Sequence, residues 1–273
     1  MEQQYIITLE ELSFSLAYCG YDGMAAGMLR ENLGDISEES WEMVLQTAAR
    51  SLYSKGILLN LNEDSIDDSF VDGFKDLLDD MASSAYMIRC YNENENGQFV
   101  LTVHQGKNGL VYHLVSNQII HILNYINSER LKEELTTFFQ PNFNLSANHL
   151  SFSCNEEDFH LLNESLENNE DFNSIIHSGR LLGENSLALE TYVQDYKQQQ
   201  GNFVNISLIK TEENELPAFK EVYLLLIGHE RTWSIHNSNL DKNQDPQLMI
   251  QALSKSDWQG MLNRLITSMR GEL

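Results

Sequence analysis

The sequence repeats one order of structural elements in its two halves, and this repeat limits the folds that the chain can adopt. In each half a helical pattern is followed by three short strand patterns, an alternating apolar segment and a helix that begins near a serine. The first copy comprises residues 67–81, 86–91, 99–104, 110–115, 119–126 and a helix from Ser128. The second comprises residues 186–200, 203–209, 221–227, 232–236, 248–253 and a helix from Ser256. Because sequential strands with short connections pair as meanders, the repeat predicts two related meanders.

The repeat predicts an α+β fold. Two related halves, residues 1–140 and 141–273, are expected to build a central antiparallel sheet with quasi-twofold symmetry, flanked by two helical bundles. No Pro- or Gly-rich linker separates the halves, so we expect one continuous domain. Thr8 and Glu11 have the spacing of a capping box, and Ser128 and Ser256 are predicted to be N-caps.

The chain is strongly acidic, which excludes several classes of partner. It contains 41 Asp and Glu and 17 Lys and Arg, a formal net charge of -24. Such a surface repels phosphate groups, so we expect neither nucleic acid nor anionic membranes as partners. Residues 8–61 have the element order of a winged helix, but residues 1–85 hold 17 acidic and 4 basic side chains, a net of -13 that argues against DNA binding. A basic or amphipathic helical protein is the better electrostatic match, although acidity also serves solubility alone.

Other features predict a reduced, cytoplasmic protein. Residues 1–4 lack the basic and apolar regions of a secretion signal. The longest clearly apolar run, residues 222–227, is far too short to span a bilayer. Cys19, Cys90 and Cys154 form neither a CxxC pair nor a metal-ligand spacing, so we expect free thiols.

An acidic row accompanies the predicted helix over residues 67–81. Its aspartates recur every four residues: Asp64, Asp68, Asp72, Asp76 and Asp80. Like charges at this spacing destabilise a helix by a few tenths of a kcal/mol per pair. The ordinary interpretation is a solvated face, and the functional one is a surface for a cationic partner, centred on Asp68, Asp72 and Asp76.

No catalytic or cofactor-binding motif is present in the sequence. It lacks a P-loop, a G-x-G-x-x-G turn, a G-x-S-x-G elbow and an H-E-x-x-H pair. We therefore expect a protein that is not an enzyme and has no cofactor and no metal. His104 and His113 flank one predicted turn, and His229 and His236 flank the equivalent one. A zinc site is thus an alternative to histidines that hydrogen-bond the backbone.

Three stretches of the sequence follow a pattern that is known from one protein family. The first is the opening Ile7-Thr-Leu-Glu-Glu-Leu, and the second is Ala48-Ala-Arg-Ser-Leu-Tyr-Ser-Lys-Gly-Ile-Leu. The third is the strand at 233–236 followed by Leu248-Met-Ile-Gln-Ala-Leu-Ser-Lys-Ser-Asp-Trp and a helix to Met269. Along nearly the whole chain they resemble, in this order of elements, the EspG family, the cytoplasmic chaperones of type VII (ESX) secretion systems.

The resemblance implies a quasi-symmetric sheet between two helical bundles and a role in holding a helical secretion substrate. The composition, poor in Pro and Arg, is typical of a low-GC Gram-positive bacterium. There the implied partner would be a WxG-like helical hairpin or the targeting domain of an LxG-type toxin.

A chaperone of this kind needs an exposed apolar patch for its substrate. Leu216, Pro217 and Phe219, in a long connection of the second half, are the candidates for it; alternatively they pack over the sheet edge. A second functional hypothesis is an immunity protein that neutralises a toxin by direct binding. The partner's identity separates the two, because a chaperone binds the toxin's helical domain and an immunity protein its catalytic domain.

Overall fold

The protein has the α+β fold that the repeat predicts, with a large antiparallel sheet of ten strands and eight α-helices in the part of the chain that is described. The computed structural model describes residues 3–34, 37–61, 66–94, 97–143, 150–168, 186–211, 216–237 and 247–271. The chain divides into two compact units. Unit 1 comprises Met1–Leu131 and Lys210–Ala218, and unit 2 comprises Lys132–Ile209 and Phe219–Leu273.

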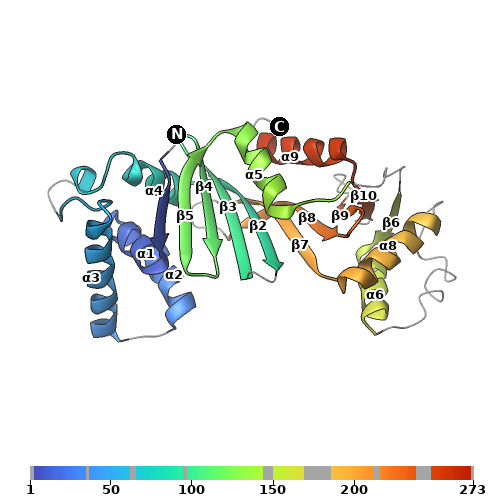
Figure 1. The fold of residues 1–273 in the computed structure, drawn as a ribbon, viewed down its shortest axis with the longest axis horizontal. Helices are drawn as coiled ribbons and strands as arrows, with labels where there is room; N and C mark the ends of the chain where they lie inside the picture. Colours follow the sequence, from blue (N-terminus) through green and yellow to red (C-terminus); the bar gives the residue numbers. More distant parts are fainter. Residues whose placement is uncertain are drawn as a thin grey trace. The chain divides into compact units, whose positions relative to one another are not determined.

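Unit 1 combines a helical layer with five antiparallel strands (Figure 1). In chain order its elements are β1 Tyr5–Thr8, α1 Leu9–Tyr18, α2 Asp22–Leu33, α3 Glu38–Ser54, a 3-10 turn Ile66–Asp68, α4 Phe74–Ala82, β2 Tyr86–Asn94, β3 Gly97–Gln105, β4 Leu110–Ser116 and β5 Ile120–Ile126. The strand order is β1-β5-β4-β3-β2, and each of these neighbouring pairs is antiparallel. Helix α5, Ser128–Phe139, follows the last strand.

Unit 2 repeats this arrangement. Its elements are β6 Ser151–Asn155, α6 Glu156–Glu167, α8 Ser186–Gln199, β7 Phe203–Lys210, β8 Ala218–Ile227, β9 Thr232–Asn237, β10 Gln247–Ala252 and α9 Lys255–Met269. The strand order is β7-β8-β9-β10-β6. In both units a four-stranded meander receives a fifth strand, which precedes the helices in sequence and pairs with the last strand of the meander. The predicted duplication is therefore confirmed at the level of strand order.

Each unit has its own hydrophobic core between helices and sheet. In unit 1 the core includes Ile7, Leu12, Leu52, Phe74 and Leu123. In unit 2 it includes Phe152, Leu162, Tyr192, Trp233 and Ile250. In each unit, alternate side chains of the strands face these helices, as the two-residue period of a strand requires.

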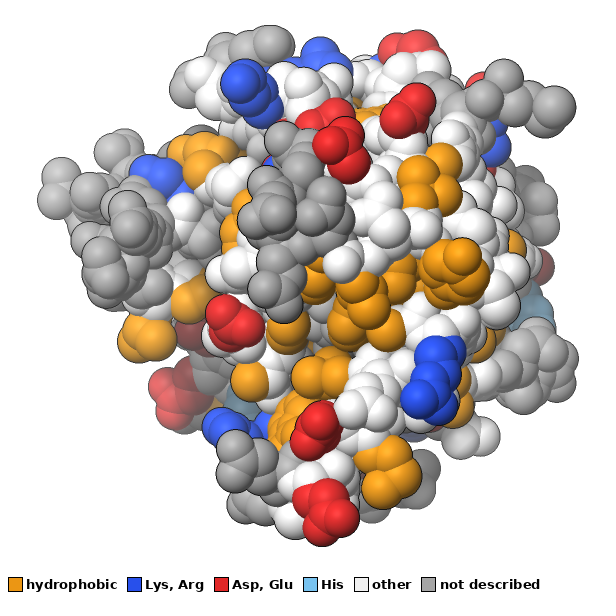
Figure 2. Space-filling model, turned by 90° about the vertical axis from the view of Figure 1, so that its left-hand side faces the viewer, with side chains coloured by type: hydrophobic (Ala, Val, Ile, Leu, Met, Phe, Trp, Pro, Cys, Tyr) orange, Lys and Arg blue, Asp and Glu red, His pale blue; other side chains and the backbone are white. Residues whose placement is uncertain are grey.

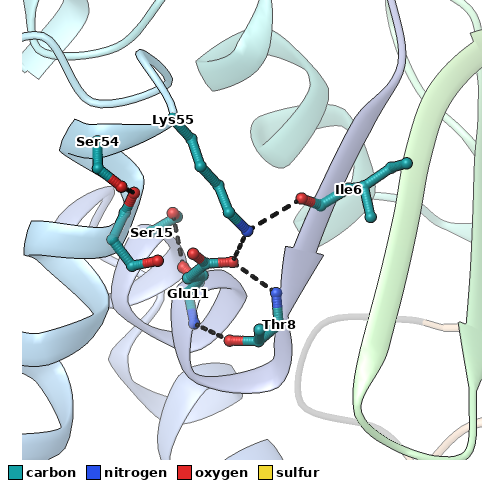
Figure 3. A network of polar contacts seen from close by, with 7 residues as sticks. Ile6, Thr8, Glu11, Ser15, Ser54 and Lys55 are labelled. Carbon is teal, nitrogen blue, oxygen red and sulfur yellow. Dashed lines mark hydrogen bonds and ion pairs between the residues drawn. The ribbon is translucent and has the colours of Figure 1, made fainter.

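The first helix is fixed at its start by a buried glutamate (Figure 3). Thr8 N donates to Glu11 Oε2 at 2.6 Å, and Glu11 N donates to Thr8 Oγ1 at 3.3 Å, which confirms the predicted capping box. Lys55 Nζ lies 2.7 Å from the same carboxylate and 3.2 Å from the Ile6 carbonyl oxygen. Lys55 thus ties the end of α3 to the start of α1 and to the edge strand β1.

Two predicted helix caps are wrong by one or two residues. Asn127, not Ser128, caps α5, because Arg130 N donates to Asn127 Oδ1 at 3.0 Å. Ser254, not Ser256, caps α9 and forms a capping box with Asp257. Both chain stretches contain competing Ser, Asn and Asp residues, and the strand that precedes each helix decides which of them adopts the extended backbone of an N-cap.

Candidate partner-binding surfaces

The predicted apolar patch lies on a segment that enters β8. Leu216 is 90% exposed, Phe219 66% and Val222 40%, and Pro217 is exposed as well. Within the described residues β8 pairs with β9 only from Tyr223 onward, so the first half of the strand extends beyond the register of that pair. Burying a Leu or Phe side chain stabilises a folded protein by roughly 1.5–3 kcal/mol. The exposed Leu216 and Phe219 do not contribute this free energy. The segment therefore has the exposure that a partner-binding surface requires, while its binding role stays a prediction.

Glu221 anchors the same segment to α9. Ser268 Oγ donates to Glu221 Oε1 at 2.9 Å, and Tyr223 OH donates to Glu221 Oε2 at 3.1 Å. Burial first, and then the charge of Glu221, raise the pKa of Tyr223 to about 12. These two hydrogen bonds thus fix the strand at Glu221, which lies in sequence between the exposed residues Phe219 and Val222.

A small polar cavity of about 210 Å³ lies beneath α9. Its lining includes Tyr223, His236, Gln251, Asp257 and Arg264. Burial and the nearby Arg264 guanidinium lower the pKa of His236, so its imidazole is neutral at pH 7. The cavity is smaller than the roughly 300–1,000 Å³ that drug-sized ligands occupy.

The aspartates of the predicted row do not share one helix, which corrects that expectation. Gly73, with φ +79°, is the N-cap of α4, so the helix begins at Phe74 and not near residue 67. Asp68 ends the 3-10 turn, Asp72 precedes the cap, and Asp76 alone of the three lies on α4. All three are exposed, but a glycine in the left-handed region separates them into different segments. Asp64 lies outside the described residues.

Asp80, the last aspartate of that row, is a structural residue. Its side chain is buried and accepts hydrogen bonds from the backbone N–H groups of Lys107 and Asn108, both at 2.9 Å. Tyr125 OH donates to it at 2.9 Å. The carboxylate thereby holds the β3–β4 turn against α4. These internal contacts account for Asp80 without a binding partner.

Three histidines and Thr102 form a hydrogen-bonded line across β3, β4 and β5. Thr102 Oγ1 lies 3.1 Å from His104 Nε2 and 3.4 Å from His113 Nδ1, and His113 Nε2 lies 2.8 Å from His121 Nδ1. Burial lowers the pKa of His104 and of His121 to about 4. His104 and His113 therefore contact other side chains of the sheet, and the sequence had not indicated the third member, His121.

His229 of the second predicted pair is exposed. Within the described ranges no group of three or more His, Cys, Asp or Glu side chains is placed to hold a metal ion.

A second depression, of about 510 Å³, lies beside α8 and the β8–β9 turn. Arg231 Nε pairs with Asp195 Oδ2 at 3.2 Å, and Trp233 Nε1 donates to the same oxygen at 2.8 Å. Both charged side chains are largely buried. Since the carboxylate already pairs with one guanidinium and accepts one hydrogen bond, we interpret it as a tie between α8 and β9.

The sequence did not predict the exposed apolar side chains on the helical side of unit 1. Figure 2, in which this side faces the viewer, shows hydrophobic side chains gathered between acidic and basic ones. The exposed fractions are 62% for Met43, 64% for Tyr53, 49% for Leu59, 62% for Leu61 and 40% for Leu33. The difference in helix length is the signal that could have indicated them. Helix α3 has 17 residues and α1, against which it packs, has only 10, so α1 cannot cover the whole apolar stripe of α3.

The order of elements and the fold connect the chain to known proteins. Residues 4–262 match the model of the family described as "Uncharacterised protein YfjC". The curated proteins contain no match. Among solved structures the chain is similar to the type VII secretion system chaperone EspG5 of Mycobacterium tuberculosis, solved in complex with a PE25-PPE41 dimer. The TM-score is 0.65, with 9% sequence identity over 97% of this chain and 96% of that chain. At this identity the likeness concerns the fold, and it confirms the remote structural resemblance that the three sequence stretches indicated.

Proposed function

Because the chain belongs to the YfjC family and has an EspG-like fold, we propose that it is a chaperone for a helical substrate of a type VII secretion system. The observation that carries the proposal is the likeness to EspG5 over 97% of the chain. In this proposal the protein acts in the cytoplasm, without catalysis or a cofactor, and keeps its substrate soluble until export. No helix in the described part of the chain is both long enough and apolar enough to cross a bilayer.

The exposed segment at the start of β8 supplies a physical basis for substrate binding. A helical export substrate presents an apolar stripe before it meets its partner, and Leu216 and Phe219 offer apolar surface of matching character. Glu221, which follows them in the same strand segment, accepts a hydrogen bond from Ser268 of α9. The two apolar side chains therefore lie on a segment that is anchored to a helix. Anchoring lowers the entropy that is lost when a partner binds.

The net charge of -24 narrows the choice of substrate. It favours a partner with basic residues beside its apolar stripe, and it disfavours polyanions. More specifically, we propose that the substrate is a WxG-like helical hairpin or the helical targeting domain of an LxG-type toxin.

Co-expression tests the proposal. The tagged protein is produced together with WxG-like and LxG-type proteins encoded beside it, each LxG protein as the full chain, the helical domain or the catalytic domain. We expect the helical domain to co-purify and to become more soluble. Retention of the catalytic domain instead would establish the immunity hypothesis, and retention of neither would refute the chaperone proposal.

The binding segment is tested by Leu216→Asp and Phe219→Asp, with Leu187→Asp as the matched control. Leu187 lies on α8 and is 61% exposed, so it carries a comparable exposed apolar side chain. We expect the first two variants to lose substrate at an unchanged melting temperature and the control to retain it. Unfolding of either variant would show that the segment belongs to the core.

A further inference from the structure

The apolar stripe of α3 continues beyond the helix that covers it. Helix α1 packs against both α2 and α3. With 17 residues against 10, α3 is about 10 Å longer than α1, since an α-helix rises about 1.5 Å per residue. The second half of α3 is the covered part, because Ala48, Ala49 and Leu52 are buried there. The first two turns of α3 are therefore the part of the helix that α1 covers least.

This less covered part of the stripe is apolar. Trp41, Val44 and Leu45 stand at helical spacing with Ala48 and are only half-buried. Leu33 does the same on α2: it continues the buried stripe of Ala25 and Leu29 by one turn, yet it is 40% exposed. We name Leu33, Trp41, Val44 and Leu45 the helical tip.

The charges around the helical tip are mainly acidic. Between residues 30 and 50 the sequence contains five acidic residues and two basic ones, Arg30 and Arg50, which stand at the two ends of the stretch. Glu31, Glu39 and Glu42 are exposed beside the apolar residues. An apolar stripe bordered by carboxylates complements a helix that carries basic residues along the edges of its own apolar stripe.

We propose that the helical tip binds an amphipathic helix of another protein, with Lys or Arg on both sides of the apolar stripe. The bound helix lies along α3 where α1 ends and covers the next two turns of the stripe. A second copy of this chain does not fit, because its own net charge of -24 repels the carboxylates around the tip. This inference goes beyond the proposed function: the surface is separate in sequence from Leu216 and Phe219, and its partner is defined by chemistry and not by export.

Trp41 provides a direct readout. The chain has 3 Trp residues; Trp233 and Trp258 are fully buried, and Trp41 is half-buried. A helix that covers the tip removes water from Trp41 and shifts the fluorescence emission to shorter wavelength. The probe is a designed 18-residue peptide without Trp, built from Leu on one face and Lys on the other. Its twin carries Glu in place of every Lys.

We expect the Lys peptide to shift the emission of the wild-type protein at physiological salt, and the Glu twin to leave it unchanged. The variant Trp41→Phe should lose the shift while it still binds the fluorescently labelled Lys peptide in an anisotropy titration. The double variant Glu31→Lys/Glu42→Lys should weaken binding at least tenfold, and Leu33→Ser/Leu45→Ser should do the same.

The control is Glu164→Lys/Glu190→Lys, which changes the net charge equally on the exposed faces of α6 and α8. Unchanged binding in this control supports a specific site, and equal weakening would reduce the effect to general attraction between opposite charges. Absence of an emission shift, or an equal affinity of the Glu twin, overturns the inference. Thermal melting of each variant identifies any loss of folding. Because no secretion substrate is used, failure here leaves the chaperone proposal to its own co-expression test.

Discussion

The ion pair of the buried Glu11 and the exposed Lys55 (Figure 3) leads to an asymmetric prediction. The Glu11 side chain is 2% exposed and that of Lys55 is 37% exposed. Burial opposes ionisation of Glu11, but hydrogen bonds from Lys55, Ser51 and Thr8 outweigh it and hold the pKa of the carboxyl below its ordinary value. Lys55→Met leaves a buried carboxylate without its cation, whereas Glu11→Gln leaves an ammonium that can turn to water. We therefore expect Lys55→Met to be the more damaging change at pH 7.

The structure sets the magnitudes. Glu11→Gln keeps an acceptor for Thr8 N, since Gln also serves in a capping box, so it should cost about 1 kcal/mol for one weakened charge-assisted bond. Removing one partner of a fully buried ion pair costs roughly 3–5 kcal/mol. Because Lys55 is partly exposed, we expect Lys55→Met to cost about 2 kcal/mol, below that range.

Urea unfolding at several pH values measures both effects. A carboxyl whose pKa is lowered on folding stabilises the protein above its unfolded pKa, and this contribution is lost as the pH falls through the folded pKa. In Lys55→Met the lowering is removed, so the difference from wild type should be constant above the ordinary carboxyl value of about 4.5 and should shrink as the pH falls below it. The double variant Glu11→Gln/Lys55→Met should be less destabilised than the sum of the single variants. A larger loss for Glu11→Gln, or a loss for Lys55→Met that does not change with pH, would refute the reasoning.

Three further predictions concern stability. Ser254→Ala should lower the free energy of unfolding by about 1 kcal/mol and Ser256→Ala by clearly less; equal effects in urea unfolding would contradict the assignment of Ser254 as the cap of α9. Asp80→Ala should cost about 3 kcal/mol, because two backbone N–H groups and one hydroxyl lose a buried acceptor; a change in melting temperature no larger than that of a surface variant would argue against this. Burial lowers the pKa of His121 from 6.5 to about 4, so the unfolded state binds protons more readily and stability should fall as the pH drops from about 6.5 to 4; His121→Gln should flatten this dependence, and an unchanged slope would exclude the role of His121.

Local patterns in the sequence determined much of the fold. The meander strands follow from alternating apolar residues separated by polar turns, because each strand buries one face against the helices of its own unit. The capping box of Thr8 and Glu11 followed from spacing alone. The short strands β1 and β6 were not predicted, since four or five residues at a sheet edge carry too little periodicity to be recognised. Their identity depends on pairing with β5 and β10, which are distant in sequence.

The sequence by itself determined the class of fold, the duplication and the sign of the surface charge. Composition and the spacing of apolar residues can be read from the sequence without any knowledge of tertiary contacts. Only the tertiary structure decided which equivalent residues take which role. Asp80 became a buried acceptor while Asp76, one turn away, stayed in water, because the β3–β4 turn presents two backbone N–H groups to one position alone. In the same way Trp41 and Leu52 belong to one apolar stripe of α3, yet Leu52 is buried and Trp41 is only half-buried, because the shorter helix α1 covers part of the stripe. Burial depends on what lies opposite a side chain, and the sequence of one helix does not contain the length of its neighbour.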